Sequence, residues 1–249
     1  MIIYFSGTGN SRYVAEKLLN EGEKLVDAAK EEFTVCDESR LGVVFPCYCG
    51  DMPPKLIEFM KKSVINKPDY AFAVCTCGAS AGRSFSSLKY LLCSKGATLD
   101  FAESLVMPDS CVLYAFPRRV VKKLLDSADE RIGLIKAKID GAERKETKAK
   151  KPLGFRAKAV WFMFGRIVGV YKKRADENCV GCGECLKVCK AGNIKIENGK
   201  AVFGEKAESC YQCFACINVC PKCAVRFGTL KNSEEKKYYH PAYRGAKEE

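Results

Sequence analysis

Eight of the sixteen cysteines fall into two identically spaced runs near the carboxyl end of the chain. Each run has the pattern C-x2-C-x2-C-x3-C, and the second begins at Cys210, 31 residues after the first begins at Cys179. A short loop can turn three thiolates at this spacing toward one cuboidal iron–sulfur cluster, with backbone N–H groups facing the sulfurs. Gly181 and Gly183 give the first loop the backbone freedom that such a turn needs. The runs therefore predict metal centres.

Paired cysteines have two other common uses. C-x2-C pairs also bind zinc, but a structural zinc site needs only a closed set of four ligands. Two interleaved runs of four cysteines therefore disfavour zinc. A disulfide framework is typical of secreted chains, whereas Met1 to Phe5 reads as the start of a strand rather than a signal peptide. We therefore expect a cytoplasmic protein with reduced cysteines, in a low-potential, anaerobic setting.

The stretch from Cys179 to Pro221 resembles the two-cluster ferredoxin domains. In that family the fourth cysteine of each run ligates the cluster of the other run. The resemblance implies two [4Fe–4S] clusters. The first would be held by Cys179, Cys182, Cys185 and Cys220, and the second by Cys189, Cys210, Cys213 and Cys216. One departure is that Lys190, not proline, follows the first run, which bears on cluster potential more than on cluster presence.

The amino-terminal part alternates apolar runs with stretches of helical periodicity. This alternation predicts a doubly wound, parallel five-stranded sheet of the α/β class, with helices on both faces. Ligands of such sheets bind at the carboxyl ends of the strands. The expected strands are residues 2–5, 33–36, 41–45, 70–75 and 98–107, and the expected helices are residues 13–19, 54–60, 85–92 and 120–139.

Three loops at these strand ends could bind a ligand. The first is Ser6-Gly-Thr-Gly-Asn-Ser11, in which hydroxyls, glycine N–H groups and a helix N-terminus converge on an anion. It is not the dinucleotide fingerprint, because Arg12 replaces the third glycine, and no Walker lysine follows. The second loop begins at Pro46 and offers an aromatic ring at Tyr48. The third runs from Thr76 to Gly82.

These loops, in this order, resemble the phosphate and ring-binding loops of the flavodoxins. The resemblance covers residues 1–143 and implies a flavodoxin-like fold that binds FMN, with Tyr48 stacking beside the flavin ring. The implied FMN-binding residues are Ser6, Gly7, Thr8, Gly9, Asn10, Ser11, Pro46, Cys47, Tyr48, Gly50, Thr76, Cys77, Gly78 and Gly82. Cys47, Cys49, Cys75 and Cys77 fall on adjacent strand ends, and we interpret them as reduced thiols beside a cofactor rather than a third metal centre or a flavin-reactive thiol.

The rest of the chain connects or follows these parts. Residues 144–173 read as a basic linker and an amphipathic helix, which either packs between domains or lies on a membrane. Residues 174–230 are the expected ferredoxin domain, small and α+β, with a hairpin turning at Asn198-Gly199. Residues 231–249 form a charged tail, in which His240 is expected at the surface. This is the only histidine, so a Ser-His-Asp arrangement is not supported.

Composition limits the partners. The formal net charge is +12, and two clusters and one phosphate would remove about half of this excess. What remains favours an acidic redox partner protein, either a ferredoxin-like donor or an acceptor enzyme, and leaves peripheral membrane contact open. No apolar run approaches the roughly 20 residues of a transmembrane helix. No motif indicates nucleic-acid binding.

Taken together, the chain resembles a flavodoxin–ferredoxin fusion protein. The resemblance implies an electron-transfer iron–sulfur flavoprotein that passes electrons between two [4Fe–4S] clusters and an FMN. Two alternatives stay open. One is an FMN-dependent reductase of a quinone, nitro or unsaturated compound, and the other is a cluster protein whose flavodoxin-like domain is an empty docking platform.

Overall fold

The structure is a computed structural model that describes residues 1–112, 115–152, 173–204, 210–228 and 232–243. The chain forms two compact units. The first contains Met1–Ser6, Asn10–Pro108 and Arg119–Leu153, and the second contains Gly7–Gly9, Asp109–Arg118 and Gly154–Glu249. Each unit is described by itself.

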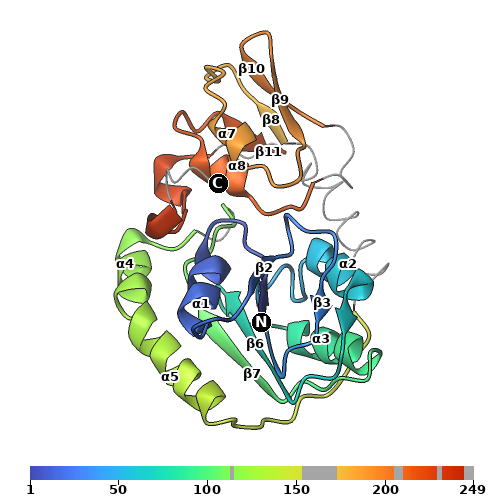
Figure 1. The fold of residues 1–249 in the computed structure, drawn as a ribbon. Coiled ribbons are helices and arrows are strands. Elements are labelled where there is room, and N and C mark those ends of the chain that lie inside the picture. The colour runs from blue at the N-terminus through green and yellow to red at the C-terminus, as the bar shows by residue number, and fades with distance from the viewer. Residues whose placement is uncertain (113–114, 153–172, 205–209, 229–231, 244–249) are drawn as a thin grey trace. The chain divides into compact units, whose positions relative to one another are not determined.

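A parallel five-stranded sheet forms the centre of the first unit (Figure 1). Its order is β2-β1-β4-β6-β7, and all four pairings are parallel. In chain order this is 2-1-3-4-5, so the strand order reverses beside the first strand. The strands are β1 (Ile2–Tyr4), β2 (Leu25–Asp27), β4 (Arg40–Pro46), β6 (Tyr70–Cys77) and β7 (Phe101–Val106).

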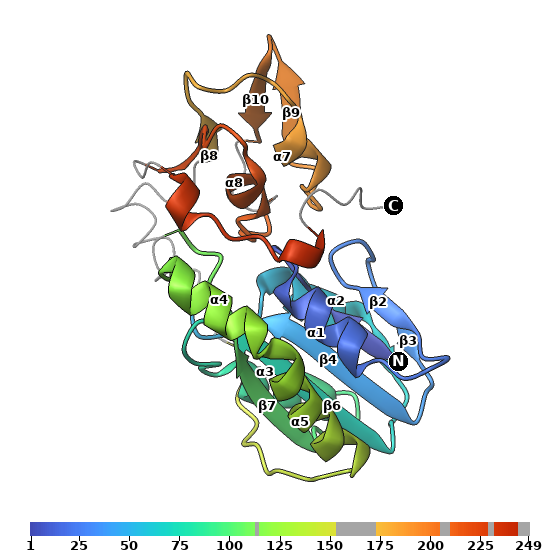
Figure 2. The ribbon, with the colours of Figure 1, turned by 90° about the vertical axis from the view of Figure 1, so that its left-hand side faces the viewer.

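Helices cover both faces of this sheet. α1 (Asn10–Leu18) and α5 (Ala128–Asp140) pack with the side chains of Tyr4, Val44, Phe72 and Val74, and Figure 2 shows both helices in front of the sheet. On the opposite face, Phe45 meets Phe85 of α3 (Ser84–Cys93) with ring centroids 6.4 Å apart, and α2 (Pro54–Lys62) packs beside α3. All eight residues of β6 are buried, as expected for a central strand.

The predicted strand at residues 33–36 is wrong as a member of the main sheet. Its place beside β1 is taken by β2, while β3 (Val35–Cys36) pairs with β5 (Val64–Ile65) in a separate two-stranded sheet. Phe33 is 55% exposed, so the apolar residues that suggested a buried strand lie partly at the surface. β2 is a three-residue edge strand, too short to leave a clear periodic signal.

The predicted single helix over residues 120–139 is two helices, α4 (Arg118–Asp126) and α5. Ser127 lies between them and its hydroxyl donates to the carbonyl of Lys123 at 3.0 Å. A serine hydroxyl that bonds back to the preceding turn bends a helix, which explains the break. The remaining predicted strands and helices of the first unit are confirmed.

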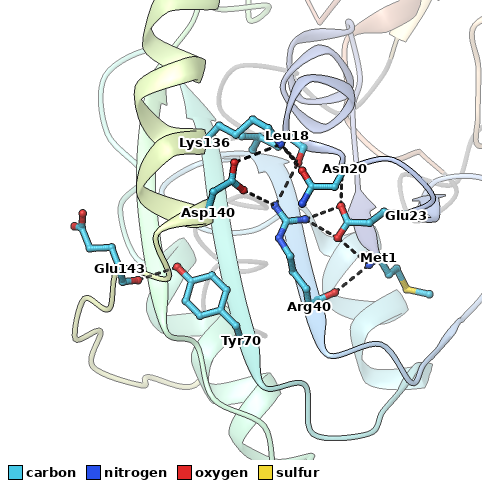
Figure 3. Close-up of polar contacts among 9 residues, drawn as sticks. All are labelled: Met1, Leu18, Asn20, Glu23, Arg40, Tyr70, Lys136, Asp140 and Glu143. Carbon is cyan, nitrogen blue, oxygen red and sulfur yellow. Dashed lines mark hydrogen bonds and ion pairs between the residues drawn. The ribbon is translucent and has the colours of Figure 1, made fainter.

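Polar contacts fasten the amino-terminal ends of the strands, opposite the candidate loops (Figure 3). Arg40 donates to both carboxylate oxygens of Glu23 at 2.6 Å and to the carbonyl of Leu18 at 3.3 Å. The Met1 ammonium donates to the carbonyl of Arg40 at 2.9 Å. Burial alone would raise the pKa of Glu23, but the Asn20 N–H and the Arg40 guanidinium lower it below the usual value. These bonds therefore join the starts of β1 and β4 to the turn before β2.

Short elements form the second unit. β8 (Lys173–Ala175) pairs antiparallel with β11 (Val225–Phe227), and β9 (Ile194–Glu197) pairs antiparallel with β10 (Lys200–Phe203). Asn198 and Gly199 both have positive φ, 49° and 71°, which confirms the predicted hairpin turn. The helices are α7 (Glu184–Lys187) and α8 (Ala215–Val219), followed by the 3-10 turns η2 (Glu234–Lys236) and η3 (Pro241–Tyr243).

The two cysteine runs share one backbone conformation. Gly181 and Gly183 have φ of 65° and 79°, and the equivalent positions of the second run, Gln212 and Phe214, have φ of 55° and 59°. The second run therefore takes the same left-handed turns without glycine. Phe214 is held there by Phe227, whose ring centroid lies 4.8 Å away.

The predicted amphipathic helix of the linker lies outside the described residues. So do residues 205–209 and 229–230 of the expected ferredoxin domain, and residues 231 and 244–249 of the tail. Among the helices that are described, none is long and apolar enough to cross a membrane.

Candidate metal centres and strand-end loops

Two pockets in the second unit are each lined by four cysteines. Both pockets are partly open to solvent. The cysteines of the first pocket are Cys179, Cys182, Cys185 and Cys220. Those of the second pocket are Cys189, Cys210, Cys213 and Cys216. In each set, three cysteines come from one run and the fourth from the other.

Two short helices distribute the thiols between the pockets. α7 carries Cys185 toward the first pocket, and Cys189 follows one turn later toward the second. α8 carries Cys216 toward the second pocket, and its C-cap residue Cys220 lines the first. Cys189 lies just past the end of α7 and Cys220 just past the end of α8, so the chain leaves each helix where the last cysteine of the run lines the other pocket. The x3 spacing at the end of each run thus has a structural reason.

Backbone N–H groups point at the sulfurs. In each pocket two sulfurs accept such a bond, at 3.3 or 3.4 Å. The donors are Ala201 to Cys179, Ala224 to Cys220, Asn193 to Cys189 and Gln212 to Cys210. Such bonds stabilise negative charge on sulfur, as a cluster ligand requires.

Three of these thiols are hard to ionise by themselves. Burial, followed by the charges of neighbouring thiols, raises the pKa of Cys185 to about 11. Burial likewise raises the pKa of Cys213 and Cys216 above the usual value. A set of thiolates here therefore needs positive charge in its midst, which the irons of a cluster would supply. The donor set, the burial and the N–H groups all fit a [4Fe–4S] cluster.

The carboxyl ends of the strands bring the predicted flavin loops together in the first unit. Ser11, at the start of α1, shares a hydrogen bond of 2.8 Å with the hydroxyl of Thr76. The N–H of Cys47 donates to the carbonyl of Thr76 at 2.9 Å, and that of Arg83 donates to the carbonyl of Gly50 at 2.7 Å. The start of α1, the loop after β4 and the loop after β6 therefore form one edge.

The other predicted residues of this unit lie on the same edge. Asn10 donates its amide to the carbonyl of Pro108 at 2.9 Å. Tyr48 is half-buried, meets Phe5 edge-on at 5.9 Å and exchanges backbone bonds with Asp51. Ser6 and Cys77 are buried, Pro46 pairs with Thr76 in the sheet register, and Gly78 follows β6 in the third loop.

The middle of the first loop, Gly7–Gly9, belongs to the second unit and is covered there by the tail. The N–H of His240 donates to the carbonyl of Thr8 at 2.8 Å. A Cβ at Gly9 would lie 2.7 Å from both His240 and Tyr243. The expectation that His240 lies at the surface is therefore wrong, since this residue is only 5% exposed. The glycine at position 9 gives it the room to pack.

Cys47 and Cys75 are brought together, whereas Cys49 is exposed. A hydrogen bond from the Cys75 thiol is the main cause that lowers the pKa of Cys47 from 9.0 to about 7, with burial opposing and the Gly50 N–H assisting. Burial raises the pKa of Cys75, which therefore stays protonated and able to donate. Among the described residues of the first unit, no three Cys, His, Asp or Glu side chains gather closely enough to hold a single metal ion.

We predict that Cys47 is the thiol of the first unit most readily alkylated near neutral pH. Its rate with iodoacetamide should rise through about pH 7, because only the thiolate attacks. The pKa of Cys47 is about 7 in the folded chain, below its ordinary value of 9.0. The thiolate therefore contributes its full stabilisation above about pH 9, and this stabilisation is lost as the pH falls through about 7. Peptide mapping of timed reactions measures the rate. In Cys75→Ala the midpoint should move upward; an unchanged midpoint would contradict the bond.

Two features of the second unit were not predicted from the sequence. Residues after β7 pack into it: Val112 joins its core, and the amide of Asn218 donates to the carbonyl of Ser110 at 2.9 Å. Lys173 donates to the sulfur of Cys210. The first has no local signal in the sequence. The second could have been suspected, because Lys173 lies six residues before Cys179, but its direction requires the fold.

The thiol pockets and the short paired strands define a small iron–sulfur domain, and the comparisons with known proteins give its class. Residues 171–221 match the family model of the 4Fe–4S dicluster domain. The chain belongs to the ferredoxins of this type through that domain.

Three relatives support this assignment. An uncharacterised ferredoxin of Methanocaldococcus jannaschii is 38% identical over 58 residues, which are 22% of this chain and 74% of that protein. Ferredoxin-3 of Nostoc sp. is 30% identical over 73 residues, 22% of this chain and 75% of that protein. One component of an ion-translocating oxidoreductase complex of Methanosarcina acetivorans is 35% identical over 54 residues, and the match spans 22% of this chain and 20% of that component.

Proposed function

We propose that this chain is an electron-transfer iron–sulfur flavoprotein that passes electrons between two [4Fe–4S] clusters and an FMN. The observation that carries the cluster part is the division of the eight thiols into two pockets of four. The proposed ligands are Cys179, Cys182, Cys185 and Cys220 for the first cluster. They are Cys189, Cys210, Cys213 and Cys216 for the second.

The FMN part rests on the first unit. Its strand order, 2-1-3-4-5, is the order of the flavodoxin-like sheets, which bind FMN where the order reverses. Ser11 and Thr76 meet at that point, and Tyr48 lies on the neighbouring loop. The proposed site also includes Ser6, Asn10, Cys47 and Gly50, with the turn from Gly78 to Gly82. The FMN-binding role of Gly7–Gly9 is part of the same proposal.

The chemistry divides between cofactors and chain. Clusters carry single electrons, and a bound flavin supplies a group that can take up or release two. The chain's own part is to bind and tune these groups. Backbone N–H groups on the sulfurs stabilise the charge that a cluster gains on reduction. A redox partner protein, ferredoxin-like or an acceptor enzyme, would exchange electrons with this assembly.

One observation favours a second candidate, a cluster protein whose first unit binds no flavin. The tail residues His240 and Tyr243 pack against Gly9, where a phosphate would approach the loop. In that case the loop would be a docking surface for the tail. The FMN-dependent reductase remains a further alternative, distinguished by turnover with a small-molecule acceptor.

Anaerobic purification followed by metal and flavin analysis tests the proposal. We expect about eight irons per chain and one acid-released FMN, with the absorption of both groups in the spectrum. Iron far below this value would overturn the two-cluster assignment. Full iron without flavin would leave the clusters in place and favour the second candidate. Turnover of a quinone with dithionite as donor would instead support a reductase.

A further inference from the structure

We propose that Lys173 raises the reduction potential of the cluster in the second pocket above that of the cluster in the first. An electron entering this domain would then rest on the second cluster. The inference rests on the proposed binding of both clusters and goes beyond it, because it assigns a direction to electron movement between them.

The position of Lys173 is fixed on several sides. Its ammonium donates to the sulfur of Cys210 at 3.2 Å and to the side-chain oxygen of Gln212 at 2.7 Å. It lies 5.6 Å from the ring centroid of Phe214 and 5.5 Å from that of Phe227. The residue is only 9% exposed. As the first residue of β8, it is also held by its pairing with Phe227 of β11.

A buried ammonium needs a negative partner, since taking its charge out of water is costly. Gln212 offers only a neutral oxygen, and the two rings offer weak attraction. The remaining contact is the sulfur of Cys210, a proposed cluster ligand. The burial of Lys173 is therefore explained by a negative group in the second pocket, as a cluster with its thiolates would be.

Each pocket is lined by a lysine, Lys222 in the first and Lys190 in the second, and Lys173 is the additional charge of the second pocket. Among the described residues, backbone N–H groups at 3.3 or 3.4 Å bond two sulfurs in each pocket, so these donors are matched. In the part of the chain that the structure describes, Lys173 is the side-chain cation that donates to a pocket sulfur. Lys237 reaches the backbone carbonyl of Cys220 near the first pocket, but it forms an ion pair with Glu234, which offsets its charge.

Reduction adds one negative charge to a cluster. A fixed positive charge on a ligand sulfur favours the reduced form, and in a partly buried site this attraction is weakly screened. We expect Lys173 to favour reduction of the second cluster at least about tenfold, which corresponds to about 59 mV for one electron. Lys173 is thus the side-chain charge that favours reduction of the second cluster over the first.

The test is an anaerobic redox titration of the full chain, followed by electron paramagnetic resonance. Lys173→Gln should lower the potential of one cluster by at least about 59 mV, a tenfold change, and leave the other unchanged. Lys173→Arg keeps the charge and should retain the wild-type value. Lys195→Gln, an exposed position of β9, removes the same net charge and should have little effect.

A second variant covers the case in which Lys173→Gln fails to hold its cluster. Gln212→Glu places a carboxylate against the Lys173 ammonium and should lower the same potential while the lysine stays in place. Unchanged potentials in either cluster-loaded variant, or an equal shift in Lys195→Gln, would overturn the inference and leave the two-cluster proposal intact. Failure of the proposed function shows differently, as missing iron in the wild-type chain.

Discussion

Replacing Cys179 and Cys220 together by alanine should remove one cluster and leave the other, so that about four of about eight irons per chain remain. Both side chains line the first pocket although they come from different runs. The second pocket keeps its four thiols in this variant, and so keeps its ligands. Two lost ligands of four leave the first cluster without a closed coordination shell.

The matched control exchanges two cysteines of the same run. Cys179 and Cys189 both belong to the first run, but they line different pockets. Replacing these two by alanine takes one ligand from each cluster, and we expect both clusters to be impaired, with iron well below four per chain or conversion to clusters of lower iron content. If each run held its own cluster, the two double variants would give the opposite result.

Iron analysis and electron paramagnetic resonance on anaerobically purified protein measure both outcomes. Because metal binding and folding are coupled in small metal domains, the variant impaired at both sites should also lose the cooperative unfolding of the second unit. Circular dichroism against denaturant detects this loss. Equal iron in the two double variants would contradict the interleaved arrangement.

The cluster region was largely predictable because the separation of its cysteines along the chain indicates which of them can bind one cluster. The x2 and x3 separations fix which thiols can share a short loop, and the two glycines of the first run mark its left-handed turns. The second run shows the limit of such reasoning. Gln212 and Phe214 also have left-handed backbone conformations, which their residue types do not predict. The packing of the Phe214 ring on Phe227 accounts for the conformation at Phe214.

The buried strands of the sheet were predicted correctly, whereas the edge strand β2 was not predicted. β4 and β6 are long, apolar and buried, so periodicity identifies them. β2 has three residues, and its membership depends on pairing with β1 rather than on its own composition. Residues 33–36 were predicted in its place because Phe33 is apolar, although its side chain is exposed.

The burial of His240 and Lys173 was not predicted from the sequence because it depends on contacts between residues far apart in the chain. The contact of His240 with Thr8 joins positions 232 residues apart in the chain, and the Lys173–Cys210 bond depends on strand pairing. Neither residue has a motif around it. Their burial could not be predicted from residue type, because lysine usually lies at the surface and histidine is intermediate in burial.

Replacing Gly82 by alanine should separate two loops of the proposed flavin site. Gly82 has a φ of +55°, and a Cβ there would lie 2.4 Å from the carbonyl oxygen of Gly50. That oxygen accepts the hydrogen bond from the N–H of Arg83 at 2.7 Å, which joins the loop after β4 to the loop after β6. Backbone atoms cannot move aside as a flexible side chain can, so the loops must part.

We expect Gly82→Ala to lower the free energy of unfolding of the first unit by about 2–4 kcal/mol, from left-handed strain and overpacking together. If these loops bind FMN, its affinity should fall at least about tenfold, since a misplaced loop loses contacts worth more than about 1.4 kcal/mol. Denaturant unfolding gives the first quantity, and fluorescence titration of the flavin-free protein with FMN gives the second.

Gly22→Ala is the control for left-handed strain without a collision. Gly22, outside the proposed flavin site, also has a positive φ, +77°, but a Cβ there would meet nothing within 4 Å. This variant should therefore lower the free energy of unfolding by only about 1 kcal/mol and retain FMN. A Gly82→Ala protein as stable as the wild type would refute the loop contact. A destabilised Gly82→Ala protein with unchanged FMN affinity would instead place the flavin elsewhere, because the contact would be real but the loops would not be its binding site.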